Sequence, residues 1–207
     1  MKITTPGRIC LFGEHQDFLG LPVIALAISL RSTINATKRN DRKIIINMPD
    51  INKVEDFSLD DLSYLKDRDY FKSSIKVCLK HGLSFSRGFD SVIRSEIPIR
   101  AGVSSSSSII VGWIKLICCL SDNPPNWDNQ MIGKLAYEAE VLEFDEPGGM
   151  MDQYSTAIGD CIFLSQKPLH IKKLNHGLGA FVLGNSNQPK DTLGILRRCR
   201  DQRALMM

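Results

Sequence analysis

The sequence lacks the features that mark several classes of protein. None of its six cysteines belongs to a CxxC pair, so the pattern is neither that of a zinc site nor that of an evident disulfide framework. The net charge is only +3, and no dense run of Lys and Arg precedes residue 188. The most apolar stretch, residues 109–120, contains Lys115 and falls short of the ~20 residues of a membrane span. We therefore expect no nucleic-acid partner and no membrane segment.

What remains is the composition of an ordinary globular chain. The 207 residues are 43% apolar and 24% charged, which excludes a disordered or fibrous protein. The length corresponds to one domain, or to one domain and part of another. Cys118 and Cys119 are adjacent within an apolar run, which indicates buried, reduced thiols. Since the N-terminus also shows no leader pattern, we expect a cytoplasmic protein.

Strands and helices mix along the chain without a regular βαβ rhythm. This mixture favours a layered α+β fold over a doubly wound sheet. Apolar periodicity predicts strands over residues 2–12, 22–30, 44–46, 89–97, 161–164, 169–173 and 180–184. It predicts helices over residues 70–79, 108–120, 126–144 and 191–205.

The C-terminal part has little chain to cover its apolar residues. We expect the strands at 161–164 and 180–184 to expose apolar surface that a longer chain would cover. A monomer rarely leaves a large apolar patch open, so we also expect self-association through this part. The sequence therefore predicts that the chain is incomplete at its C-terminal end.

A serine-rich loop precedes the helix expected at 108–120. Gly102 has no Cβ and lets the backbone turn closely around a ligand. The amides that follow it point outward at a helix N-terminus, where an anion is favoured. Serine hydroxyls add donors and, towards a metal, hard oxygen ligands. The loop suits a nucleoside triphosphate, although it is neither a Walker A loop nor a Gly-x-Gly-x-x-Gly motif. A flexible serine linker with a helix cap is the alternative.

Ionisable residues cluster between two glycines near the N-terminus. Arg8 lies within an apolar strand, and Glu14, His15 and Asp17 follow it in a short loop. Carboxylates and an imidazole can accept and donate hydrogen bonds to the hydroxyls of a polyol. A polar turn with a satisfied histidine is the alternative.

Asp152 stands apart from the other acidic residues of its region. It follows Gly149 and two methionines, and a carboxylate in apolar surroundings needs a partner or a shifted pKa. Arg8, itself in an apolar strand, is the candidate partner. A carboxylate beside an arginine can accept a hydroxyl proton while the cation stabilises phosphoryl charge. We predict that Arg8 and Asp152 meet across one cleft.

Three segments together resemble the GHMP small-molecule kinases, and most closely the galactokinases. The first is Pro-Gly-Arg…Gly-Glu-His-x-Asp at 6–17, and the second is Pro-x-x-x-Gly-Val-Ser-Ser-Ser at 98–106. The third is Met-Asp-Gln at 151–153. The resemblance implies a layered N-terminal GHMP kinase domain, of the ribosomal protein S5 domain 2-like type, over residues 1–158. It implies the start of a C-terminal ferredoxin-like domain over residues 159–207.

The resemblance also implies a role for each matching residue. The residues implied to bind the phosphates of ATP are Gly102, Ser104, Ser105 and Ser106. Those implied to hold Mg²⁺ are Ser106 and Glu140. Those implied to form the catalytic pair are Arg8 and Asp152. Those implied to contact the sugar are Glu14, His15, Asp17 and Gly149.

The implied activity is ATP- and Mg²⁺-dependent phosphorylation of a small sugar, at its anomeric hydroxyl. Two alternatives stay open. The first is a relative that binds sugar and ATP without turnover; the absence of the family's third, glycine-rich motif favours it, whereas Arg8 and Asp152 argue against it. The second is a mevalonate-type kinase, but mevalonate kinases lack an acid that matches Asp17.

Overall fold

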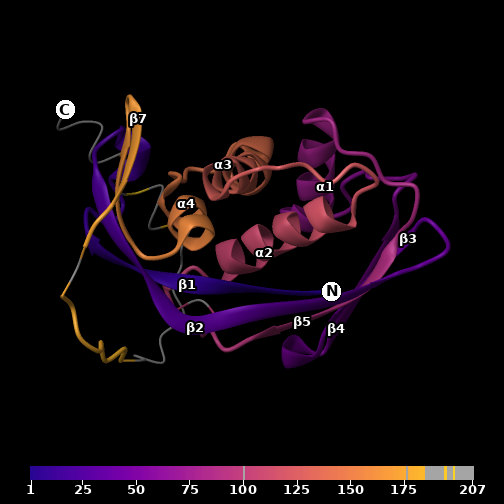
Figure 1. Cartoon of the computed structure of the whole chain (residues 1–207), viewed down its shortest axis with the longest axis horizontal. Helices are drawn as coiled ribbons and strands as arrows, with labels where there is room; N and C mark the ends of the chain where they lie inside the picture. The colour runs from indigo at the N-terminus through magenta and orange to yellow at the C-terminus, as the bar shows by residue number, and fades with distance from the viewer. Residues whose placement is uncertain (100, 176, 185–193, 195–197, 199–207) are drawn as a thin grey trace.

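The structure, a computed structural model, describes residues 1–99, 101–175, 177–184, 194 and 198. In these residues the helices lie on one side of a seven-stranded sheet (Figure 1). The strands are β1 (Lys2–Phe12), β2 (Val23–Lys38), β3 (Lys43–Met48), β4 (Lys53–Ser58), β5 (Phe89–Ser95), β6 (Cys161–Gln166) and β7 (Leu169–Lys173). The α-helices are α1 (Tyr70–Lys80), α2 (Ser105–Leu120), α3 (Asn129–Glu140) and α4 (Met151–Ile158). The expected layered α+β fold is confirmed.

Strand β2 organises the sheet because it is long enough to pair along both edges. β1 runs antiparallel to it, from Lys2 opposite Asn35 to Phe12 opposite Ile24. On its other edge, the end of β2 pairs with β5 and its start pairs with β6. The strand order is β4-β3-β5-β2-β6-β7, with β3 and β5 parallel. β6 and β7 thus extend the sheet that the N-terminal strands build, and the domain division at residue 158 stays a prediction.

Two apolar clusters hold the helices that shape the site. The larger one packs α1, α2 and α3 on the sheet around Trp113, whose ring centroid lies 4.9 Å from that of Phe71 and 5.2 Å from that of Phe89. The indole NH of Trp113 donates to the Phe71 carbonyl at 3.2 Å. The smaller cluster packs α4 against β2 and β6 and consists of Val23, Ala25, Met151, Tyr154, Ile162 and Leu164. Burial of these side chains holds α2 and α4 against the sheet.

Two helices differ in extent from the expectation. α2 begins at Ser105 rather than at residue 108, because the loop turns at Ser104, whose φ is +60°, and the next serines form the first helical turn. The helix expected over 126–144 is α3, which is shorter. Asp128 caps it by accepting a hydrogen bond from the Met131 amide at 2.8 Å. A separate 3-10 turn, Leu142–Phe144, follows α3.

Several other expectations need correction. β4 and α4 have no counterpart among the predicted elements, and β2 continues through a segment whose polar residues suggested an end. The strand expected at 180–184 is wrong, since residues 177–184 adopt no regular structure. Phe181 and Val182 are exposed as expected, but Cys161, Ile162 and Leu164 of β6 are buried. The helix expected over 191–205 lies outside the described residues, apart from positions 194 and 198.

No helix in the described part of the chain is long and apolar enough to cross a membrane. The five cysteines of that part are free thiols, and Cys119 is exposed rather than buried. Self-association through the C-terminal part stays a prediction.

Candidate active site

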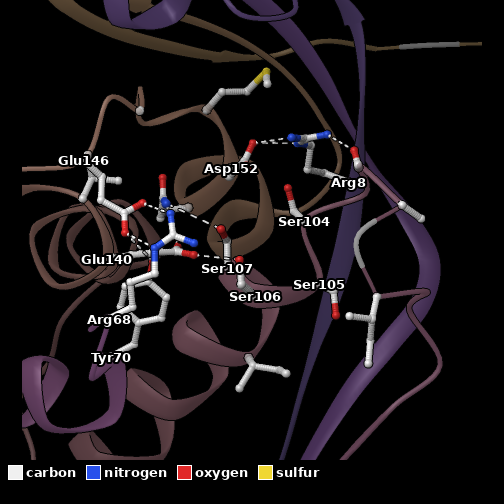
Figure 2. A pocket seen from close by; sticks show the side chains of 18 of the residues that line it. Arg8, Arg68, Tyr70, Ser104, Ser105, Ser106, Ser107, Glu140, Glu146 and Asp152 are labelled. Carbon is white, nitrogen blue, oxygen red and sulfur yellow. Dashed lines mark hydrogen bonds and ion pairs between the residues drawn. The ribbon is translucent and has the colours of Figure 1, made fainter. Parts of the chain in front are cut away.

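One cavity of about 810 Å³ collects every residue that the sequence places in a site. It is lined by the loop after β1, the serine-rich loop, the end of α3 and the start of α4 (Figure 2). The described residues contain no cluster of three or more His, Cys, Asp or Glu side chains that could hold a metal ion. A metal in this cavity would therefore need hydroxyl or amide ligands besides a carboxylate.

Arg8 and Asp152 form an ion pair, although 144 positions separate them. Asp152 Oδ1 accepts from Arg8 Nε at 2.8 Å and from Nη2 at 2.5 Å. The third donor, Nη1, reaches the Gly102 carbonyl at 2.7 Å. The Arg8 side chain is 6% exposed, whereas 33% of the Asp152 side chain is open to the cavity. The predicted meeting of the two residues is confirmed.

The charge on Arg8 is secure despite its burial. Burial lowers the pKa of the guanidinium, but the negative charge of Asp152, with a smaller contribution from Glu14, outweighs it, so the pKa is raised overall. The backbone of β1 also ties Arg8 to the serine-rich loop, because its amide donates to the Val103 carbonyl at 3.2 Å. A Cβ on Gly7 would lie 2.9 Å from that same oxygen. Glycine is therefore what allows β1 to approach the loop.

The serine-rich loop ends in a sharp turn at the N-terminus of α2. Gly102 has a φ of +77° and Ser104 a φ of +60°, and only the first of these suits its residue type without strain. Ser105 and Ser106 open onto the cavity, whereas Ser108 is buried and anchors the helix by donating to the Thr5 carbonyl at 3.1 Å. The Oγ of Ser104 is buried without a hydrogen-bond partner. Free amides and hydroxyls at a helix N-terminus can bind an anion.

Glu140 places a buried carboxylate at the end of α3. The side chain is 6% exposed. Its Oε1 accepts from Ser106 Oγ at 2.8 Å, and its Oε2 accepts from Gln153 Nε2 at 2.7 Å. Burial raises the pKa of Glu140, and these hydrogen bonds offset the shift only in part. No Lys or Arg of the described residues lies at ion-pairing distance from it. The charge of Arg68 acts on Glu140 from beyond ion-pairing distance. A buried carboxylate beside a hydroxyl, with no cation in direct contact, fits the hard oxygen preference of Mg²⁺.

Asp17 joins the loop after β1 to the start of α4. Its Oδ2 accepts from the Met151 amide at 2.9 Å, which places a carboxylate at a helix N-terminus. Burial raises the pKa of Asp17, and the hydrogen bond from Met151 opposes that shift. A Cβ at Gly149 would overlap the Asp17 carboxylate, so glycine is required there. His15 Nε2 lies 3.6 Å from Glu14 Oε1 on the same loop.

Sequence reasoning missed two parts of the cavity wall. Arg68 and Tyr70 both bind Glu146: Arg68 Nη2 donates to Oε2 at 2.7 Å and Tyr70 OH to Oε1 at 2.8 Å. Arg68 belongs to the charged stretch of residues 60–69, whose composition indicates only a solvated surface, so the sequence does not single it out. Gln153 gave a signal, because it belongs to the Met-Asp-Gln motif at 151–153, but its contact with Glu140 depends on how α3 and α4 pack.

Comparisons with known proteins identify the family of this chain. Residues 69–160 match the family "GHMP kinases N terminal domain", and residues 2–38 match the "Galactokinase galactose-binding signature". The chain belongs to the GHMP kinase family through this N-terminal domain.

Within that family, galactokinases are among its most similar relatives. The galactokinase of Clostridium perfringens is 34% identical over 199 residues, covering 90% of this chain and 50% of the relative. The mevalonate kinase of Methanocaldococcus jannaschii is 34% identical over 148 residues, covering 68% of this chain and 46% of the relative. The crystal structure of Lactococcus lactis galactokinase complexed with galactose superposes with a TM-score of 0.75 and 27% identity, covering 83% of this chain and 46% of that structure. The chain thus spans about half the length of the relatives it matches.

Proposed function

We propose that this protein is an ATP- and Mg²⁺-dependent sugar kinase that transfers the γ-phosphate of ATP to the anomeric hydroxyl of a small sugar. One observation carries the proposal: the Arg8–Asp152 ion pair lies in the same cavity as the serine-rich loop and the Asp17–Gly149 contact. A phosphate site, a polyol site and a carboxylate between them are the parts that phosphoryl transfer to a hydroxyl requires.

Asp152 is the residue suited to handle the proton of the attacking hydroxyl. Two donors of Arg8 occupy its Oδ1, whereas none of the described side chains donates a hydrogen bond to Oδ2. A carboxylate held in this way can orient a hydroxyl and accept its proton. Arg8 stays charged beside it and can stabilise the negative charge that gathers on the transferred phosphoryl group. Catalysis would then come from positioning and charge rather than from a covalent intermediate.

The nucleotide would be held by the turn at the start of α2. The amides that follow Gly102, with the hydroxyls of Ser105 and Ser106, would bind its phosphates. Ser106 and Glu140 would hold Mg²⁺, which supplies neutralisation of phosphate charge when bound. The Glu140 carboxylate supports this assignment because it is buried beside the Ser106 hydroxyl.

A mevalonate-type kinase is the second candidate, because a mevalonate kinase is 34% identical over 148 residues. Mevalonate is itself a carboxylate. Glu14 and Asp17 both line the cavity and would repel an anionic substrate, whereas a neutral sugar can donate its hydroxyls to them. The carboxylates of the loop after β1 therefore favour the sugar.

An ADP-release assay tests the proposal. Galactose, glucose and mevalonate would be compared at saturating Mg·ATP, and ³¹P NMR would identify the phosphorylated position of the product. We expect turnover with a sugar and none with mevalonate. Turnover only with mevalonate would replace the substrate class, and sugar binding by calorimetry without ADP release would leave a binding protein in place of a kinase.

A further inference from the structure

Gln153 is buried in the cavity wall and is only half satisfied. Its side chain is 3% exposed. Nε2 donates to Glu140 Oε2 at 2.7 Å and lies 3.5 Å from Ser107 Oγ. The other end of the amide, Oε1, is buried with no hydrogen-bond partner. A buried acceptor without a partner has lost its hydrogen bonds to water, so a donor supplied by a ligand would stabilise this site.

The first turn of α4 explains why Gln153 can reach Glu140. Met151, Asp152 and Gln153 are consecutive, so their side chains point in different directions around the helix, while the free first-turn amides point along its axis. The Met151 amide binds Asp17, Asp152 binds Arg8, and Gln153 turns to α3. The first turn of α4 therefore contacts three parts of the cavity wall: Asp17 in the loop after β1, Arg8 in β1, and Glu140 at the end of α3.

We propose that Gln153 is a positioning residue of the divalent-cation site, and this rests on the proposed function. By donating to Oε2, it fixes the plane of the Glu140 carboxylate so that Oε1 stays beside Ser106. Its own Oε1, which has no protein partner, accepts a hydrogen bond from water bound to the cation. Mg²⁺ commonly keeps several such waters, and partners that orient a ligand carboxylate contribute strongly to metal affinity.

Gln153→Met tests the positioning role, because methionine keeps the length of the side chain but can neither donate nor accept as an amide does. Mn²⁺ would be titrated in the presence of a non-hydrolysable ATP analogue, well below the melting temperature. We expect the affinity for Mn²⁺ to fall by about 10–100-fold, with sugar affinity unchanged. Gln130→Met is the control, since Gln130 is an exposed glutamine of α3, and it should bind Mn²⁺ as the wild type does.

Gln153→Glu covers the case in which Gln153→Met fails to fold. It places a second carboxylate against Glu140, and two like charges repel until a cation lies between them. Its melting temperature should therefore fall in EDTA and rise with Mn²⁺ by more than that of the wild type. An equal rise in both proteins would overturn the proposal.

The outcomes distinguish the role of Gln153 from the proposed kinase function. Mn²⁺ affinities of wild type and Gln153→Met that agree within about twofold would overturn the role of Gln153 and leave the kinase proposal standing. A wild type that binds the ATP analogue but no Mn²⁺ would overturn both the role of Gln153 and the metal part of the proposed function.

Discussion

Two carboxylates, the part-exposed Asp152 and the buried Glu140, share the cavity and are satisfied in different ways. Asp152 has a cation within the chain, because two donors of Arg8 converge on its Oδ1. Glu140 accepts hydrogen bonds from neutral side chains, Ser106 and Gln153 among them, and forms no ion pair with a described Lys or Arg; the charge of Arg68 acts on it only from a longer distance. Burying a charge without an opposite charge is costly. The Arg8–Asp152 pair is thus electrostatically complete within the protein, whereas we propose that a cation from outside completes the Glu140 site.

The largest expected effect comes from removing the charge of Asp152. Asp152→Asn keeps the shape of the side chain but cannot accept a proton from the hydroxyl. Loss of a general base typically costs about 10²–10⁴-fold, so kcat for the sugar should fall by that factor. Sugar affinity measured by calorimetry should stay nearly constant. Unchanged turnover would remove Asp152 from the mechanism.

Breaking the pair from the other side should cost stability as well as activity. Arg8→Met leaves Asp152 and the Gly102 carbonyl without their donors. We expect the free energy of unfolding to fall by about 3 kcal/mol. This is the lower end of the range for breaking a buried ion pair, because Asp152 is 33% exposed. Urea unfolding would measure it. Arg39→Met is the control: Arg39 pairs with the exposed Asp41 and Asp90, and its removal should lower the free energy of unfolding far less than Arg8→Met does.

At the Glu140 site, the loss of one hydroxyl should affect the nucleotide and not the sugar. Ser106→Ala removes the donor to Glu140 Oε1 and a hard oxygen ligand. We expect the KM for Mg·ATP to rise by about tenfold or more, with the sugar KM unchanged. Ser86→Ala, a change at an exposed serine that bonds Asp122, should alter neither value. A larger effect on the sugar than on Mg·ATP would contradict the phosphate assignment of the loop.

The smallest expected effect is a gain in stability. Burial raises the pKa of Glu140, so the folded protein keeps that proton to a higher pH than the unfolded chain does. The free energy of unfolding therefore falls as the pH rises through the folded pKa. Glu140→Gln carries no such charge. Without metal, its melting temperature should exceed that of the wild type by a few degrees at pH 8, and the difference should shrink on acidification. Mn²⁺ should stabilise only the wild type; a variant that is less stable than the wild type at every pH would contradict this account.

The sequence predicted the parts of the site that depend on local pattern. The order of residue types predicts the turn at Gly102, the loop of residues 14–17 and the apolar strand around Arg8. The meeting of Arg8 and Asp152 was also predictable, because each charge lies in an apolar segment and needs a partner. The pairing follows from the free-energy cost of removing a charge from water.

What the sequence did not reveal depends on packing. The sequence predicted a loop at residues 105–107, since serine competes for backbone hydrogen bonds, yet the contact between Ser108 and Thr5 helps to draw them into α2. The start of α4 was hidden because Gly148 and Gly149 break the pattern. The length of β2 was hidden because its exposed half is polar. Gln153 reaches Glu140 only once α3 and α4 are packed together.

The most direct test of the comparison is the position of Mn²⁺ in an anomalous difference map, from crystals grown with the cation and a non-hydrolysable ATP analogue. The account predicts a peak beside Glu140 and Ser106, with the Arg8–Asp152 ion pair intact. A peak on Asp152 with Arg8 displaced, or bound nucleotide with no peak beside Glu140, would contradict it.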